Sequence, residues 1–139
     1  MSDAPPLLLD FEIQGRITVA TIRASSVLSP LNVVEFGNRV LAHVKEHPKL
    51  NLLLNFEKVD YLSSSVLTEL LRIHKAIEET RGTLRLCAVS PVIREVFEIT
   101  NLDSVFVINT ENAAVCVKRF ERALDVAAED EAWQEPKSS

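Results

Sequence analysis

Glycine is scarce in this chain, which contains 3 among 139 residues. Phosphate-binding loops of the P-loop and dinucleotide types need several closely spaced glycines, so their absence argues against a nucleotide-binding enzyme of either kind. Cysteine is rarer still, with 2 residues. Cys87 and Cys116 stand inside apolar segments, with no other cysteine at metal-ligand spacing. We interpret them as reduced core thiols, and we predict neither a metal site nor a cofactor.

Positive charge is also in short supply. Lys and Arg total 15 against 20 Asp and Glu, a net charge of -5, and no basic cluster stands out. Because affinity for nucleic acid depends largely on concentrated positive charge, direct binding of DNA or RNA is not expected. No apolar run approaches the length of a membrane span, and the start of the chain, MSDAPPLLLD, lacks the positive region of a secretory signal. We therefore expect a cytoplasmic protein without membrane insertion.

The residues that are present have the balance of a globular protein, with 47% hydrophobic and 25% charged residues. A chain of this length can bury one core without disulfides or metal. We predict a single domain over residues 1–139, with its core in residues 7–128 and an acidic, polar tail in residues 129–139.

Hydrophobic periodicity divides the chain into alternating elements. Two segments rich in aliphatic or β-branched residues flank Gln14-Gly15 and predict a hairpin. Apolar residues that recur every three or four positions elsewhere predict amphipathic helices. Gly82 is predicted to end the second helix in the left-handed conformation, and Thr110 to cap the last helix. The expected strands are 7–14, 16–23, 50–56, 83–89 and 104–108, and the expected helices are 32–46, 63–81, 90–100 and 110–128.

The resulting order is β-β-α-β-α-β-α-β-α. Strands alternating with helices after the hairpin imply right-handed crossovers and a mostly parallel sheet. The fold class is therefore α/β, with a mixed five-stranded sheet and about four helices packed against it.

Three consecutive serines interrupt the pattern in VDYLSSSVLTELL, between the third strand and the second helix. Serine is a good N-cap because its side-chain oxygen can accept a hydrogen bond from the first turn. One cap is enough. From the residues alone, the simplest interpretation is that Ser63 caps the helix and that Ser64 and Ser65 are solvated residues of its first turn.

The stretch VDYLSSSVLTELL, followed by RIHKAIEETRGTLRLCAVSPVIREVFEITNLDSVFVI, resembles the STAS domain of bacterial anti-sigma factor antagonists. The resemblance covers roughly residues 7–128, and Asn101-Leu102 matches the pair that precedes the family's last strand. Ser64 and Ser65 match the two serines of the family's Asp-Ser-Ser-Gly turn. Ser63 and Val66 stand where that motif has aspartate and glycine. Ser29 stands where the family has the aspartate of Gly-x-Leu-Asp, so both acidic positions are serine here.

This resemblance implies a signalling module that binds an anti-sigma factor with a GHKL-type kinase fold and so regulates sigma-factor-dependent transcription without touching DNA. It further implies that the kinase phosphorylates Ser65. The alternative is a STAS scaffold or accessory subunit of a signalling or transport complex that is never phosphorylated and assembles with other STAS proteins. Homodimer formation is left open. The candidate partner-binding residues are Ser29, Ser63, Ser64, Ser65 and Val66.

An enzymatic role has little support in the sequence. His74 lies nine residues beyond Ser65 on the same helix, about 13 Å away at a rise of about 1.5 Å per residue, so the two cannot form a nucleophile and base within that helix. The stretch HVKEH, residues 43–47, matches the His-x-x-Glu-His pattern of some zinc proteases, but Pro48 ends its helix at once. We expect no catalytic residue and no enzyme activity.

Overall fold

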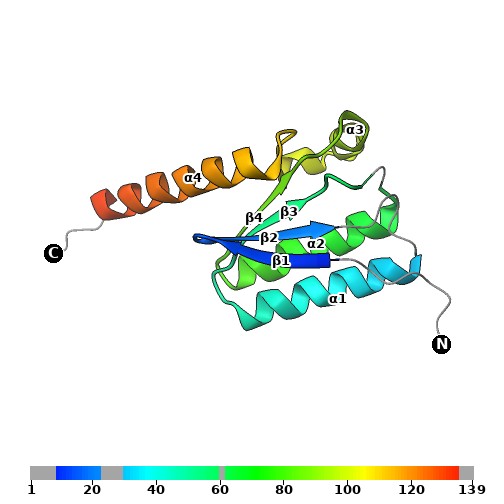
Figure 1. The fold of residues 1–139 in the computed structure, drawn as a ribbon, viewed down its shortest axis with the longest axis horizontal. Helices are drawn as coiled ribbons and strands as arrows, with labels where there is room; N and C mark the ends of the chain where they lie inside the picture. The colour runs from blue at the N-terminus through cyan, green and yellow to red at the C-terminus, as the bar shows by residue number, and fades with distance from the viewer. Residues whose placement is uncertain (1–8, 23–29, 60–61, 135–139) are drawn as a thin grey trace.

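A five-stranded mixed sheet forms the centre of the computed structural model, which describes residues 9–22, 30–59 and 62–134 (Figure 1). The predicted order of strands and helices is confirmed, with one short 3-10 helix (η1) added before the last strand. The elements are β1 (Leu9–Gln14), β2 (Ile17–Ile22), α1 (Pro30–Glu46), β3 (Asn51–Asn55), α2 (Ser64–Glu79), β4 (Thr83–Cys87), α3 (Pro91–Ile99), η1 (Leu102–Ser104), β5 (Val107–Ile108) and α4 (Ala113–Gln134).

The strands lie side by side in the order of the sequence, β1-β2-β3-β4-β5. β1 runs antiparallel to β2, and the hairpin turns at Gly15, whose φ of 65° suits glycine. The other neighbouring pairs are all parallel. Because parallel strands end at a common edge, the segments that follow β3 and β4 emerge close to each other. The serine turn lies at this edge.

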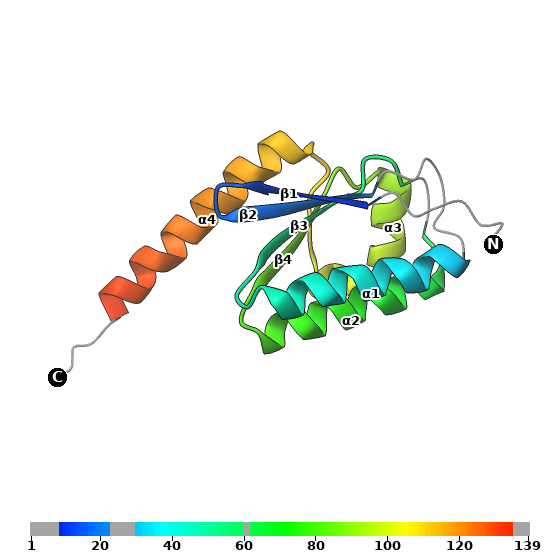
Figure 2. The ribbon, with the colours of Figure 1, turned by 60° about the horizontal axis from the view of Figure 1, so that its bottom comes forward.

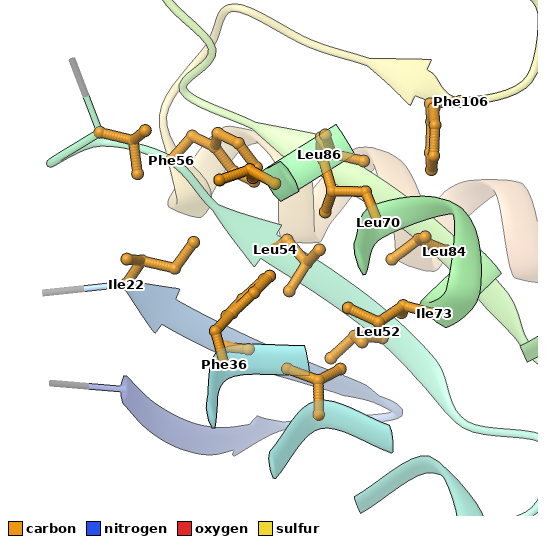
Figure 3. Close-up of a cluster of buried hydrophobic side chains, with 14 of the residues drawn as sticks. Ile22, Phe36, Leu52, Leu54, Phe56, Leu70, Ile73, Leu84, Leu86 and Phe106 are labelled. Atoms are coloured by element: carbon orange, nitrogen blue, oxygen red, sulfur yellow. The ribbon is translucent and has the colours of Figure 1, made fainter. Parts of the chain in front are cut away.

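The larger hydrophobic core lies between the sheet and helices α1, α2 and α3 (Figure 2). Alternate side chains of a strand point to opposite faces, so Leu52 and Leu54 of β3 enter this core while Leu53 points away from it. All three are fully buried, as expected for a strand covered on both faces. Figure 3 shows the centre of this core, which includes Ile22, Phe36, Leu52, Leu54, Phe56, Leu70, Ile73, Leu84, Leu86 and Phe106.

A second, smaller cluster attaches α4 to the opposite face of the sheet. It consists of Ile17, Val19, Leu53, Cys87, Cys116 and Phe120. The Arg85 guanidinium lies over the Phe120 ring, 4.9 Å from its centroid. Both cysteines are buried free thiols, and burial raises the pKa of Cys87 to about 12. These thiols are therefore protonated, inert parts of the packing at neutral pH.

An ion-pair cluster links the same helix to the tip of the hairpin. Arg16 Nε donates to Glu121 Oε1 at 2.7 Å, and Arg16 Nη2 donates to Asp125 Oδ1 at 2.7 Å. The Arg16 backbone N–H also donates to Glu121 Oε2, and this bond is the main cause of the lowered pKa of the Glu121 carboxyl. Beyond this link α4 continues past the hairpin, as both ribbon views show (Figures 1 and 2).

The predicted ends of three elements are wrong. The last strand covers only Val107–Ile108, because Leu102–Ser104 forms η1. The last helix is capped by Asn112, whose Oδ1 accepts from Val115 N at 2.9 Å, and it continues to Gln134 instead of ending near residue 128. The left-handed residue after α2 is Arg81, with φ of 63°, and not Gly82.

No helix in the described part of the chain is both long enough and apolar enough to cross a membrane.

Candidate functional site

The serine turn is held by Ser63, which is the N-cap of α2 as predicted. Its φ and ψ of -98° and 167° are extended, and its Oγ accepts a hydrogen bond from Val66 N at 3.3 Å. The Ser63 carbonyl also accepts from Leu67 N at 3.2 Å. The cap therefore uses one of the three serine hydroxyls. The side chains of Ser64 and Ser65, in the first turn, have no part in it.

Ser64 and Ser65 form the first turn of α2, and both are exposed. α2 has no acidic residue in this turn. The free N–H groups and the macrodipole make the N-terminus of a helix locally positive, so a negative group attached to Ser65 would be tolerated there. The turn thus presents a reachable hydroxyl in surroundings that accept a phosphate.

A surface hollow of about 220 Å³ lies beside Ser65, between the first turns of α1 and α2. Its lining consists of Val33, Val34, Ser65, Thr68 and Glu69. Val33 is buried, whereas 53% of Val34 is exposed, so the hollow has an apolar floor with one solvent-facing valine at its rim. This combination can receive an apolar side chain of another protein with Ser65 at its edge.

Glu69 is the part of this site that the sequence reasoning missed. Only 8% of the residue is exposed, and its Oε1 accepts from Arg72 Nη1 at 2.7 Å. The carboxylate fits against α1 because residue 37 is glycine: a Cβ on Gly37 would overlap Glu69 Oε1. The signal was present, since residue 69 lies between Val66 and Ile73 at three- and four-residue steps, on the face that turns inward.

The predicted partner-binding residues do not all lie on one surface. Ser63, Ser64 and Ser65 are together, as their adjacency requires. Ser29 lies outside the described residues. The inclusion of Val66 in a partner-binding surface is wrong, because its side chain is 1% exposed and belongs to the large core. Val66 lies four residues before Leu70 and seven before Ile73, so it belongs to the buried stripe of this amphipathic helix.

The histidines make contacts typical of packed side chains. His74 packs edge-on against Phe106, with ring centroids 5.4 Å apart, and its Nε2 lies 3.8 Å from Glu78 Oε2. The ring of His43 stacks between those of Phe11 and His47, with centroids 4.2 Å apart on each side. Within residues 9–22, 30–59 and 62–134, no three His, Cys, Asp or Glu side chains are grouped so that they could hold a metal ion.

The family model described as the STAS domain matches residues 9–114, which include the whole sheet, the serine turn and the hollow. The chain belongs to the STAS domain family. A curated relative in Bordetella bronchiseptica, named "Putative anti-sigma factor antagonist BtrV", is 32% identical over 99 residues, 70% of this chain and 83% of its own length. The predicted membership is confirmed, and the relationship is to the anti-sigma factor antagonist branch.

Solved structures of STAS proteins share this fold. The anti-sigma factor antagonist SpoIIAA in its unphosphorylated form has a TM-score of 0.68 at 18% identity, covering 82% of this chain and 96% of its own. A sulfate transporter family protein from Wolinella succinogenes reaches 0.68 at 13% identity, covering 82% and 92%. The two relatives differ in role, so the fold they share with this STAS protein does not decide between their functions.

The contact between Gly37 and Glu69 can be tested by stability. Gly37→Ala should lower the free energy of unfolding by about 1 kcal/mol, because the overlap with Glu69 outweighs the gain of about 1 kcal/mol in helix propensity. In a Glu69→Ala background the overlap is gone, and the same substitution should raise that free energy by about 1 kcal/mol. Urea denaturation of the four proteins measures both effects, and equal effects in the two backgrounds would contradict the packing described here.

Proposed function

We propose that this STAS protein is a cytoplasmic, non-enzymatic signalling module that binds an anti-sigma factor and thereby regulates sigma-factor-dependent transcription. The observation that carries the proposal is the exposed Ser65 hydroxyl at the rim of the apolar hollow between α1 and α2. The relationship to BtrV supports the same function, because that protein is named as a putative anti-sigma factor antagonist.

The docking surface consists of the hollow and the two exposed serines of the turn. An apolar side chain of the anti-sigma factor enters beside Val34, and polar groups of the partner contact Ser64 and Ser65. Burying the exposed part of Val34 and the floor of the hollow contributes favourably at about 25 cal/mol per Å² of apolar surface. Glu69, held by Arg72, forms the polar wall of the same hollow and favours a partner group that can donate a hydrogen bond to it.

Phosphorylation of Ser65 by the partner, acting as a serine kinase, is the switch in this proposal. A phosphate adds a charge of about -1.5 to -2 at neutral pH. At Ser65 it is accommodated by the N-terminus of α2, yet it stands at the mouth of the hollow, near the Glu69 carboxylate. It would therefore oppose docking by hydration and like charge without unfolding the helix. A Bacillus SpoIIAA solved in its phosphorylated form is a precedent for a phosphorylated STAS protein.

A non-phosphorylated scaffold is the second candidate. The sulfate transporter family protein from Wolinella succinogenes, which shares this fold, is associated by name with transport. Ser63 also stands where the family motif has an aspartate. A scaffold would use the same hollow for a permanent contact and would leave Ser65 unmodified.

The first experiment is mass spectrometry of the protein captured from its native cells. It reads the phosphorylation state of the peptide containing Ser63 to Ser65 and the identity of the co-purifying proteins. Phosphate on Ser65 together with a protein of GHKL-type kinase fold is the expected result. An unmodified peptide under all growth conditions, with other STAS proteins or membrane-transport subunits in the eluate, would reject the switch in favour of the scaffold.

Binding to that anti-sigma factor, measured by calorimetry with purified proteins, tests the surface itself. Ser65→Glu and Val34→Glu are each expected to weaken binding at least about tenfold, the equivalent of 1.4 kcal/mol. Ala42→Glu is the matched control, because it adds the same charge at an exposed position near the other end of α1, and it should stay within about twofold of the unmodified protein. If Ser65→Glu and Val34→Glu both bind as well as Ala42→Glu does, the partner uses another face.

A further inference from the structure

The outer face of α4 carries a charge pattern that the STAS fold does not explain. The family match ends at residue 114, at the start of this helix. The inner face, with Phe120 at its centre, packs on the sheet. Successive helix residues turn by about 100°, which directs residues 118, 122, 125 and 129 away from that face. All four are exposed: Lys118, Arg122, Asp125 and Glu129.

These four residues follow one another at steps of four, three and four, the spacing of a seam between two packed helices. Their charges run plus, plus, minus, minus. In an antiparallel copy of the same seam, Lys118 lies opposite Glu129 and Arg122 lies opposite Asp125, because both pairs are centred on the same point of the helix, between residues 123 and 124. The pattern is thus complementary to itself in the antiparallel direction, as a two-fold symmetric contact requires.

The same pattern is unfavourable for α4 standing alone. Lys118 and Arg122 are like charges four residues apart, and so are Asp125 and Glu129, and such pairs destabilise an isolated helix. The helix also has no acidic residue in its first turn and no basic residue in its last, so it lacks the charges that its dipole favours. Among the described residues neither Lys118 nor Arg122 has an ion-pair partner, whereas Asp125 is held by Arg16. The basic pair has no such compensation and would be relieved by the acidic residues of a partner of reversed polarity.

The surface around the basic half has room for a carboxylate. A hollow of about 210 Å³ is lined by Val115, Lys118, Arg119 and Arg122, three of them cationic. Arg119 Nη1 already lies 3.1 Å from Glu111 Oε2. Lys118 and Arg122 are therefore the two cations that can bind a carboxylate in the hollow. Two exposed valines border the seam on one side: 37% of Val115 and 52% of Val126 is open to solvent.

We infer that a second copy of this chain docks on α4, antiparallel to it, with Glu129 of each copy entering the basic hollow of the other. The contact is a two-fold dimer whose seam is mostly ionic, so it is weak and sensitive to salt. The valines supply its apolar border. The α4 seam lies on the other side of the sheet from the serine turn, and the inference therefore does not depend on the proposed anti-sigma factor binding.

Sedimentation velocity of the full chain tests this inference. The unmodified protein should dimerise at about 0.02 M salt and dissociate at about 0.5 M salt, where screening acts over a few ångströms. Lys118→Glu and Glu129→Lys should each raise the dimer dissociation constant at least about tenfold, since each places like charges opposite one another at both ends of the seam. Lys45→Glu, the same charge change on an exposed position of α1, is the control and should dimerise normally.

The two variants also exclude unfolding as an explanation. Lys118→Glu places a carboxylate four residues before Arg122, and Glu129→Lys places an ammonium group four residues after Asp125. Each variant thus converts a like-charge pair within α4 into an opposite-charge pair. Lys118→Glu also places a carboxylate three residues before Glu121, which offsets the gain, so we expect that variant to leave the stability of the helix unchanged and Glu129→Lys to raise it slightly. Mixing the two variants should restore a dimer, because both ends of the mixed seam then pair opposite charges. A wild-type monomer at low salt would overturn the inference, and so would a dimer that neither variant weakens or that the mixture fails to restore.

Discussion

Replacing Gly82 by alanine is expected to lower the free energy of unfolding by about 3 kcal/mol, the upper part of the range for overpacking. Gly82 lies where the chain leaves α2 and enters β4, directly against the start of β3. A Cβ there would overlap the Leu50 carbonyl oxygen and approach Leu50 N to 3.0 Å. Thr83 N donates to the same carbonyl at 2.9 Å, so neither backbone can move aside without breaking the sheet.

Arg81→Gly is the matched comparison, because it separates close packing from backbone conformation. Arg81 carries the left-handed φ of 63° in this turn, which costs a non-glycine residue about 1 kcal/mol. Its replacement by glycine should therefore raise the free energy of unfolding by up to about 1 kcal/mol. Urea denaturation measures both. A loss below about 0.5 kcal/mol for Gly82→Ala would mean that the two backbones are farther apart than described.

Replacing Phe120 by alanine should cost about 3–5 kcal/mol, the range for truncating a fully buried phenylalanine. Phe120 fills the centre of the smaller cluster, where it contacts the face of the sheet beneath α4 and carries the Arg85 guanidinium on its ring. Because this cluster has few members, no neighbouring side chain can close the cavity. We expect α4 to lose helix content before the sheet unfolds, as seen by circular dichroism during urea denaturation.

Two substitutions complete that experiment. Phe120→Leu keeps most of the buried volume and should cost less than half as much as the alanine variant. Ile99→Ala truncates an apolar residue that is 73% exposed and should change the free energy of unfolding by less than about 0.5 kcal/mol. If Phe120→Ala behaved like Ile99→Ala, the attachment of α4 would depend on the Arg16 ion pairs and not on the apolar cluster.

Elements specified by local chemistry were predicted well from the sequence. Ser63 and Ser90 each cap a helix with the side-chain oxygen, because a hydroxyl three residues before a free N–H is a local geometry. The apolar run from Leu52 to Leu54 lies in a predicted strand, and the structure buries all three residues. These features require no knowledge of distant parts of the chain.

The errors arise where two local interpretations compete. Residues 104–108 read as a strand, yet the Ser104 hydroxyl donates to the Asn101 carbonyl at 2.9 Å and closes a turn instead. The last helix was ended near residue 128, where its apolar stripe stops. Its residues remain good helix formers up to Pro136, the first strong stop signal, and the helix continues to Gln134.

The candidate site was predictable only in part. The adjacency of Ser64 and Ser65 and their exposure follow from their place in the first turn of a helix. The hollow does not, because it depends on how closely α1 approaches α2. That approach is set by Gly37 and the buried Glu69 carboxylate, which lie on different helices and meet only through the tertiary fold.

The sheet separates two apolar clusters of unequal size, and only the smaller one holds α4. The bonds that tie α4 to the hairpin join distant parts of the sequence, such as Arg16 and Glu121. Closing a loop of that length costs entropy, so we expect α4 to dock late in folding, after the larger cluster has formed. In the native state we expect the same helix to detach without disturbing the larger cluster, so that its amide hydrogens exchange with solvent earlier than those of β3.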